Sequence, residues 1–213
     1  MIKRILKLFI PQILIDNRRN RRRSNFEKAQ IKEWEDSGCP VPPPHIIKRN
    51  TIIEYQQKSG FSVLIETGTF LGDMVEAQKT RFEKIISIEL DIALFNNATE
   101  RFKNDKNITI MQGDSGKVLP EILKDIKKPA IFWLDGHYSS GITAKGEKEC
   151  PIMEELDSIL DNKMYNHILL IDDARCFVGE GDYPTVEDLT RFIKSKNEAY
   201  QVEIKHDIIK CYV

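Results

Sequence analysis

The sequence has few cysteines and no arrangement of them that is typical of a zinc site or a disulfide framework. Four cysteines occur in 213 residues, and none belongs to a Cys-x-x-Cys pair. Reduced thiols in a cytoplasmic protein are therefore expected. No apolar run approaches the roughly 20 residues that a membrane-spanning helix needs. The basic residues within 1–15 also interrupt the apolar stretch that a secretory signal would require.

An excess of either charge is also missing from the chain as a whole, but the charge is unevenly distributed. The net charge is −1, whereas residues 1–28 hold nine Lys/Arg and two Asp/Glu, a local +7. We expect residues 1–30 to be a solvated, flexible arm. An amphipathic helix that contacts a membrane surface through residues 1–28 is the alternative, although Pro11 would kink or end it. Basic side chains alone give salt-sensitive attraction to nucleic acid, so no specific nucleic-acid partner is expected.

The chain divides into the arm, a proline-rich linker at 31–50 and a regular region at 51–213. Four prolines between Cys39 and His45 favour an extended linker. In the regular region, five short apolar runs alternate with helical segments and are followed by an alternating tail at 200–213. This pattern predicts an α/β domain with a Rossmann-like, doubly wound, mostly parallel sheet, helices on both faces and a terminal antiparallel hairpin. The expected strands span 62–66, 84–89, 107–112, 130–134 and 167–171.

Polar residues or glycines follow each of the five expected strands. Taken singly, each is explained by a turn or a helix cap. Because the carboxyl ends of parallel strands meet at one edge of the sheet, where ligands of such folds bind, the whole set favours a functional site. In chain order these residues are Glu66, Gly68, Gly72, Glu89, Asp114, Ser115, Asp135, His137, Asp172 and Asp173.

The acid at the end of the second strand and the turn after the first strand indicate the kind of ligand. Glu89 stands where a carboxylate accepts hydrogen bonds from both ribose hydroxyls of an adenosine. A dinucleotide-binding turn would read Gly-x-Gly-x-x-Gly, but Phe70 occupies the middle glycine position between Gly68 and Gly72. The turn therefore argues against NAD and suits a cofactor without phosphate at this place, such as S-adenosylmethionine.

The segment 66–72, the acid Glu89 and the segment 113–115 resemble the successive motifs of class I S-adenosylmethionine-dependent methyltransferases. The resemblance covers roughly residues 50–213 and implies a seven-stranded sheet whose last strand is antiparallel. It implies that Gly68 and Gly72 face the methionine part of the cofactor, that Glu89 binds the ribose, and that Asp114 and Ser115 lie near the adenine. The other cofactor-binding residues expected with this family are Glu66, Thr69, Phe70, Asp73 and Asp135.

The last two strand ends supply three carboxylates, from Asp135, Asp172 and Asp173. Such a cluster is repulsive unless a cation neutralises it. The arrangement resembles metal-dependent O-methyltransferases of the catechol and macrolide-sugar types, which implies that these residues would bind Mg²⁺. Catechol-type enzymes carry a lysine base three residues after the strand-four Asp, where this chain has Tyr138. His137 is therefore the candidate base beside Asp135.

Tyr138 and Arg175 lie just beyond the strand ends and are the candidates to orient the acceptor. For Arg175 an ion pair with the neighbouring carboxylates is an equal alternative.

Together these patterns predict an S-adenosylmethionine-dependent enzyme that methylates a hydroxyl of a small molecule, sugar or glycan with the help of Mg²⁺. One alternative is metal-independent transfer through His137. Another is a non-catalytic cofactor-binding or scaffold domain tethered by its basic arm. A cytoplasmic location, with the arm at a membrane surface as its variant, is expected. The acceptor and the formation of a homo-oligomer stay open.

Overall fold

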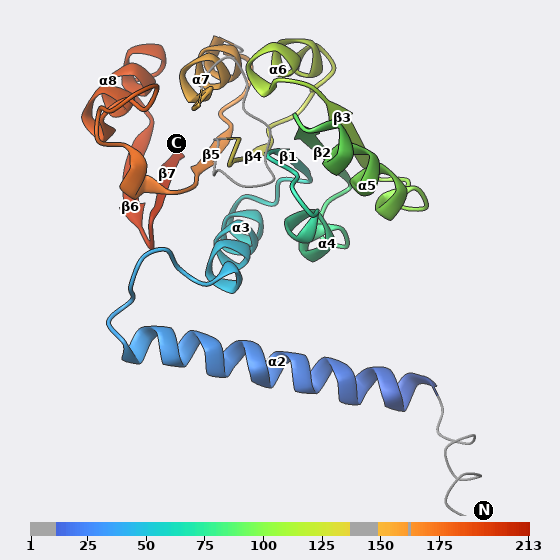
Figure 1. The fold of residues 1–213 in the computed structure, drawn as a ribbon. Helices are drawn as coiled ribbons and strands as arrows, with labels where there is room; N and C mark the ends of the chain where they lie inside the picture. Colours follow the sequence, from blue (N-terminus) through green and yellow to red (C-terminus); the bar gives the residue numbers. More distant parts are fainter. Residues whose placement is uncertain (1–11, 137–148, 162) are drawn as a thin grey trace, which may run out of the picture.

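A seven-stranded sheet forms the centre of the protein (Figure 1). The computed structural model describes residues 12–136, 149–161 and 163–213. The strand order is β3-β2-β1-β4-β5-β7-β6; β7 runs antiparallel to both of its neighbours, and the other strands are parallel to one another. This confirms the predicted sheet and its terminal hairpin. The strands are β1 (Val63–Thr67), β2 (Lys84–Glu89), β3 (Ile108–Gln112), β4 (Ile131–Leu134), β5 (Ile168–Ile171), β6 (Gln201–Lys205) and β7 (Ile208–Tyr212).

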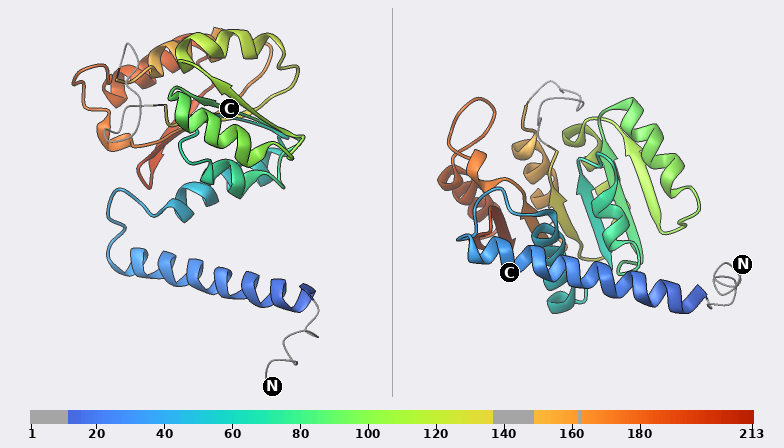
Figure 2. Two further views of the ribbon diagram at one scale, coloured as in Figure 1. Left: turned by 45° about the vertical axis from the view of Figure 1, so that its right-hand side comes forward. Right: turned by 60° about the horizontal axis from the view of Figure 1, so that its bottom comes forward.

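Helices cover both faces of the sheet and divide the core into two layers (Figures 1 and 2). Successive strand residues point to opposite faces, so Val63 and Ile65 of β1 pack with α6, α7 and α8, whereas Leu64 packs with α3, α4 and α5. The continuous apolar strands reflect this double burial. The helices of the two layers are α3 (His45–Ser59), α4 (Asp73–Gln78), α5 (Ile92–Phe102), α6 (Ser115–Lys124), α7 (Ile152–Asp161) and α8 (Val186–Lys196).

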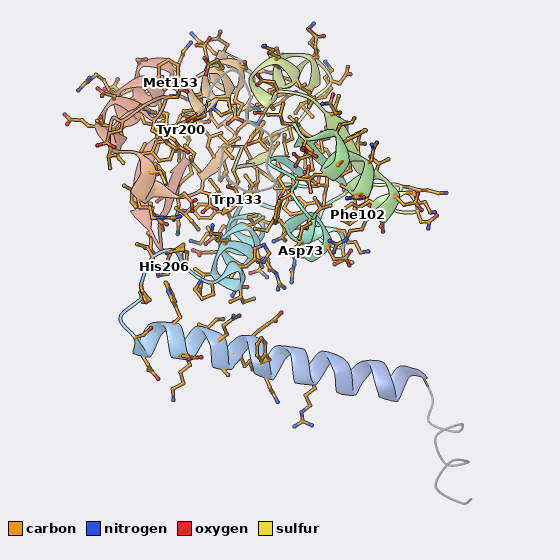
Figure 3. All side chains as sticks on the ribbon, viewed as in Figure 1. Asp73, Phe102, Trp133, Met153, Tyr200 and His206 are labelled. Carbon is orange, nitrogen blue, oxygen red and sulfur yellow. The ribbon has the colours of Figure 1, made fainter. Side chains whose placement is uncertain are left out.

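Strand β4 lies in the middle of the sheet and carries large side chains into both core layers. Phe132 is fully buried on the face of α6 to α8, and Trp133 is buried on the other face (Figure 3). This packing fixes the end of β4 relative to β1 and β5, its two neighbours. The sheet edge at which the polar residues gather therefore rests on a rigid support.

Residues 12–30 of the predicted arm are helical, because they are part of the helix α2 (Gln12–Asp36). No glycine or proline interrupts this segment, and it is rich in Arg, Lys, Gln, Glu and Leu or Ile, most of which favour helices. In Figures 1 and 2 the helix lies outside the layer formed by α3 and α4.

The segment that connects α2 and α3 is shorter than the predicted linker of 31–50. It spans only 37–44, because residues 31–36 belong to α2 and His45 already begins α3. Helix α3 starts six residues earlier than predicted, since Ile47, Ile52 and Tyr55 together form an apolar face that is buried. This early start places Lys48, a residue that the sequence did not single out, on a helix that packs against the sheet.

The C-terminal end of α2 is attached to the body through Trp34. Its indole N–H donates to the Pro40 carbonyl (2.8 Å), and its ring meets the ring of His206 edge to face with centroids 5.0 Å apart. His206 lies at the tip of the β6–β7 hairpin, on the side of the body that faces α2 (Figure 3). Among the helices that the structure describes, none is long and apolar enough to cross a membrane.

Candidate cofactor and acceptor site

The turn after β1 depends on two glycines. Gly68 and Gly72 have φ angles of +84° and +79°, a region that side chains other than glycine rarely adopt. A Cβ atom on Gly68 would lie 2.3 Å from the backbone oxygen of Asp135, and one on Gly72 would lie 2.7 Å from the ring of Phe102. The turn is therefore pressed against the end of β4 on one side and against α5 on the other.

Glu89 ends β2 beside this turn, and its carboxylate is held by two backbone N–H groups. Phe70 donates to Oε2 (2.7 Å) and Asp91 donates to Oε1 (2.9 Å). These donors belong to the two segments that flank the carboxylate, the β1–α4 turn and the start of α5. Because a carboxylate oxygen can accept more than one hydrogen bond, each oxygen retains capacity for a ligand hydroxyl.

Exposed apolar side chains surround this end of the sheet. Phe70, Leu71 and Ile92 have exposed fractions of 43%, 50% and 58%, which is high for residues of this size. A fixed carboxylate next to exposed apolar surface suits a nucleoside, which offers ribose hydroxyls and a flat base. The residues present therefore fit S-adenosylmethionine. Asp73 braces the same turn, since it forms an ion pair with Arg101 (2.8 Å).

Glu66 supports the turn from inside the protein. Its carboxyl group is buried and bonded to the hydroxyl of Ser87, which in turn lies 2.6 Å from the hydroxyl of Thr69. Burial raises the pKa of Glu66 to about 8; Ser87 opposes this rise, and the carboxylates of Asp135 and Glu89 add to it. Glu66 and Thr69, both predicted as cofactor-binding residues, thus have side chains engaged beneath the turn.

The segments that follow β3 and β4 meet around a second buried acid, Glu155 of α7. Asp114 caps α6 by accepting from the N–H of Gly116 (3.1 Å), and the hydroxyl of Ser115 donates to the buried Glu155 of α7 (2.5 Å). A Cβ atom on Gly136 would meet Glu155 and the hydroxyls of Thr67 and Ser115 at 3.0–3.2 Å. The Ser115 hydroxyl is therefore committed to Glu155, and Asp114 is the more available of the predicted adenine-side residues.

Charged residues from three parts of the chain meet at the end of β5. The ammonium group of Lys48 on α3 contacts Asp172 Oδ2 and lies 3.3 Å from Asp173 Oδ1. Arg175 pairs with the same Asp173 oxygen (2.8 Å) and with Asp207 at the tip of the hairpin. Arg175 therefore forms the ion pair that was the alternative to an acceptor contact. Its guanidinium group joins the end of β5 to the β6–β7 turn.

Burial alone would lower the pKa of Lys48, but the neighbouring carboxylates outweigh it. Attraction to Asp172, Asp173 and Asp135 raises the pKa of Lys48 above its ordinary value, so the amine is charged at neutral pH. Of the three carboxylates predicted to bind a metal, those of Asp172 and Asp173 thus have the ammonium group of Lys48 as a counter-charge.

These residues do not fit the predicted Mg²⁺ site as they stand. Within the described ranges, no three His, Cys, Asp or Glu side chains are arranged so that they could hold a metal ion. An ammonium group contacts both Asp172 and Asp173, so a metal would have to displace it. His137 and Tyr138, the predicted base and acceptor contact, lie outside the described residues.

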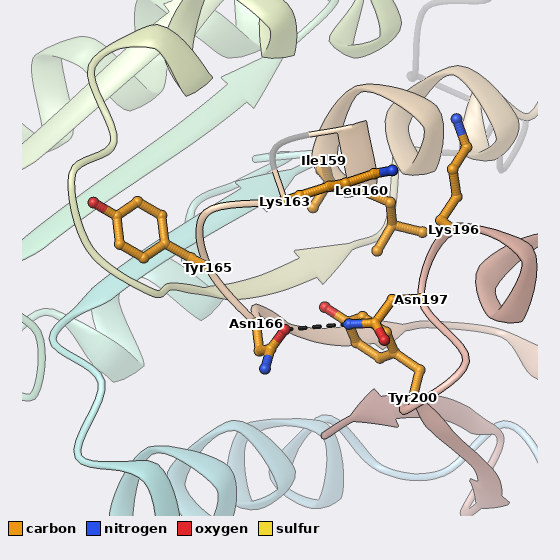
Figure 4. Close-up of a pocket in the computed structure, with 8 residues that line it drawn as sticks. All are labelled: Ile159, Leu160, Lys163, Tyr165, Asn166, Lys196, Asn197 and Tyr200. Carbon is orange, nitrogen blue, oxygen red and sulfur yellow. Dashed lines mark hydrogen bonds between the residues drawn. The ribbon is translucent and has the colours of Figure 1, made fainter.

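A pocket in the described part of the chain lies at the opposite ends of the strands from the candidate site (Figure 4). Asn166 precedes β5 and Tyr200 precedes β6, so the pocket sits at the amino ends of these two parallel strands. Lys196, one of the two lysines that line it, is paired with Asp157 and Asp161 at 2.6 and 2.7 Å. The pocket is therefore far from the strand ends that carry the candidate site.

The fold matches solved methyltransferases. An O-methyltransferase from Bacillus cereus in complex with S-adenosylhomocysteine aligns with a TM-score of 0.57 at 11% identity, covering 88% of this chain and 90% of that one. TomG from Streptomyces achromogenes, an O-methyltransferase in complex with S-adenosylmethionine, gives 0.56 at 13% identity with 87% of each chain covered. PaMTH1 from Podospora anserina gives 0.54 at 13% identity, covering 92% and 95%. The fold is that of class I S-adenosylmethionine-dependent methyltransferases.

Sequence comparison gives a weak likeness to another methyltransferase. No protein-family model matches the chain. A stretch of 185 residues is 25% identical to "Probable ribosomal RNA small subunit methyltransferase A" of Thermococcus onnurineus, covering 78% of this chain. The chain spans 65% of that protein's length.

Sequence reasoning missed two residues at this edge, Lys48 and Glu155. Lys48 lay in the segment interpreted as a proline-rich linker, although Ile47, Ile52 and Tyr55 repeat at the spacing of a buried helix face. Glu155 has a clearer signal, because it falls on the same apolar face of its helix as Ile152, Leu156 and Ile159. A lone acid on a buried helix face indicates a bonded partner.

Proposed function

We propose that this protein is an S-adenosylmethionine-dependent methyltransferase that methylates a hydroxyl group of a small molecule, sugar or glycan. The observation that carries the proposal is Glu89, a carboxylate fixed at the end of β2 by the turn that contains Gly68 and by the start of α5. The class I fold supports the choice of cofactor. S-Adenosylmethionine, when bound, supplies a methyl group that is activated by its positively charged sulfur.

In this proposal the residues of the chain bind and orient the reactants. Glu89 accepts hydrogen bonds from the ribose hydroxyls, and Phe70, Leu71 and Ile92 provide apolar surface for the rest of the nucleoside. The N–H of Asp135 is held by the Thr67 carbonyl (3.1 Å), which fixes the end of β4 beside the turn. Fixing an acceptor oxygen in line with the methyl group provides most of the rate acceleration in such transfers.

The residues proposed to contact the acceptor follow β4 and β5. Asp135 and the charged group at the end of β5 border the place where an acceptor would approach. His137 remains the candidate base for the acceptor proton, and Tyr138 remains a candidate acceptor contact. Arg175 is assigned a supporting role instead, because its guanidinium is bonded to Asp173 and Asp207.

A second candidate acceptor is RNA. The sequence likeness to the ribosomal RNA methyltransferase of Thermococcus onnurineus favours it, as does the run of five arginines between 18 and 23. Against it, the end of β4 reads Asp135-Gly136-His137-Tyr138 and lacks the Asn/Asp-Pro-Pro-aromatic pattern of many amino-directed nucleic-acid methyltransferases. The basic run would give attraction without base recognition.

Transfer of a labelled methyl group decides between these acceptors. The purified chain is incubated with methyl-labelled S-adenosylmethionine and, separately, with a catechol, a glycoside bearing a vicinal diol, and a small-subunit ribosomal RNA fragment. We expect label on the catechol or the glycoside as a base-stable ether, and loss of transfer in Asp135→Asn with little loss of affinity for S-adenosylhomocysteine. Label on an RNA base would instead support the second candidate. Cofactor binding without any transfer would favour the scaffold alternative.

A further inference from the structure

The side chain of Lys48 extends from α3 and ends between the two carboxylates that directly follow β5. Its ammonium group contacts Asp172 and lies 3.3 Å from Asp173, two residues that are more than 120 positions away in the sequence. Only 16% of the Lys48 side chain is exposed, and none of the Asp172 side chain is. This is a largely buried ion pair, in contrast to the many exposed pairs on the surface of the protein.

The position of Lys48 is fixed by its helix. The neighbouring residue Ile47 and the residue one turn later, Ile52, are both buried in the core. Thr51 anchors the same turn through a hydrogen bond to the Ile47 carbonyl (3.1 Å). A lysine held in this way does not swing freely into solvent, and burial without a partner would be costly.

The two acids that contact Lys48 depend on it for charge balance. Asp172 Oδ1 is buried and has no hydrogen-bond partner among the residues that the structure describes, so Lys48 is the cation that contacts this carboxylate in that part of the chain. Asp173 is shared between Lys48 and Arg175. Removing the ammonium group would leave the Asp172 carboxylate buried without a counter-charge, a state that favours uptake of another cation.

We infer that the ammonium group of Lys48 is the resident cation of the Asp172–Asp173 pair and takes the place of a divalent metal at this edge of the sheet. The predicted Mg²⁺ is therefore not part of the site in the native chain. The role of Lys48 as the cation of the Asp172–Asp173 pair does not depend on whether the protein transfers methyl groups. One consequence does rest on the proposed function: methyl transfer should continue in the presence of a chelator.

Binding of Mn²⁺ tests the inference directly, because free Mn²⁺ has a strong paramagnetic resonance signal that decreases on binding. The titration is made at pH 8 with the full chain, Lys48→Ala, Lys48→Arg and Lys48→Ala combined with Asp172→Asn. We expect Lys48→Ala to bind Mn²⁺ at least tenfold more tightly than the native chain, and the added Asp172→Asn change to abolish this gain. Lys48→Arg keeps the charge and should bind no better than the native chain.

Arg49→Ala is the matched control, because Arg49 is the next residue of α3 and pairs with Glu27 of α2 (3.0 Å) instead of with the acids of β5. It should leave Mn²⁺ binding unchanged. Lys48→Met, which keeps the length of the side chain, replaces Lys48→Ala if that variant does not fold. Tight Mn²⁺ binding by the native chain that is lost in Asp172→Asn would overturn the inference, and so would a folded Lys48→Ala or Lys48→Met variant that gains no Mn²⁺ affinity.

The chelator experiment separates failure of this inference from failure of the proposed function. If the native chain transfers methyl groups and EDTA stops the transfer, the inference is wrong while the proposed function stands. If no acceptor is methylated at all, the proposed function fails, and the Mn²⁺ titrations still decide the role of Lys48.

Discussion

Glu89→Ala is expected to weaken the binding of S-adenosylhomocysteine about 100-fold or more. In the proposed complex the carboxylate accepts hydrogen bonds from two ribose hydroxyls. Each hydrogen bond to a charged group contributes about 1.5–3 kcal/mol, and tenfold in affinity corresponds to about 1.4 kcal/mol. The substitution also frees the N–H groups of Phe70 and Asp91, which loosens both segments that flank the cofactor. Isothermal titration calorimetry measures the change.

Two variants make this result specific. Glu89→Gln keeps the shape and one acceptor oxygen, so an intermediate loss is expected. Glu83→Ala is the matched control: Glu83 directly precedes the other end of β2, is exposed, and pairs with Lys128. It should leave the affinity unchanged. An unchanged dissociation constant for Glu89→Ala would refute the ribose assignment.

Gly68→Ala is expected to lower the free energy of unfolding by about 3 kcal/mol and to weaken cofactor binding as well. The left-handed conformation at φ +84° costs a residue with a Cβ atom about 1–2 kcal/mol. The new methyl group would also lie 2.3 Å from the backbone oxygen of Asp135, and overpacking of this kind costs about 1–3 kcal/mol. Relief of this contact would move the turn away from β4.

Gly60→Ala separates the two contributions. Gly60 ends α3 with a φ of +69°, and a Cβ atom there meets nothing within 4 Å. This variant experiences the conformational cost alone, so a loss of about 1 kcal/mol is expected, with unchanged cofactor affinity. Urea unfolding of both variants gives the comparison. Equal losses in the free energy of unfolding for Gly68→Ala and Gly60→Ala would mean that the close contact between the turn and β4 adds no cost to a side chain at position 68.

The predictions that succeeded rest on local patterns. Strand β2 has the predicted bounds of Lys84 and Glu89, because a charged residue precedes a run of buried apolar residues that ends in an acid. The alternating tail likewise gave the hairpin, with its turn at His206 and Asp207. The resemblance to a known family implied seven strands with the last one antiparallel, and the sheet confirms both.

The parts that failed depend on contacts between distant segments. The sequence places three acids near one another, but it does not reveal that Lys48, from a segment before β1, reaches Asp172 and Asp173. The prolines between 40 and 44 made the whole segment 31–50 look like a linker. In the structure they occupy only the connection between α2 and α3, and α3 begins directly after Pro44. Whether an acidic cluster contains a metal or a lysine is a property of the tertiary structure.

Titration of the purified chain with S-adenosylhomocysteine and, in parallel, with NAD shows which cofactor the site at the ends of β1 and β2 binds. We expect saturable binding of S-adenosylhomocysteine at one site per chain and no binding heat with NAD, since Phe70 occupies the position of the middle glycine in a dinucleotide-binding turn. A folded chain that binds no S-adenosylhomocysteine, or that binds NAD equally well, would refute the assignment of this site to S-adenosylmethionine.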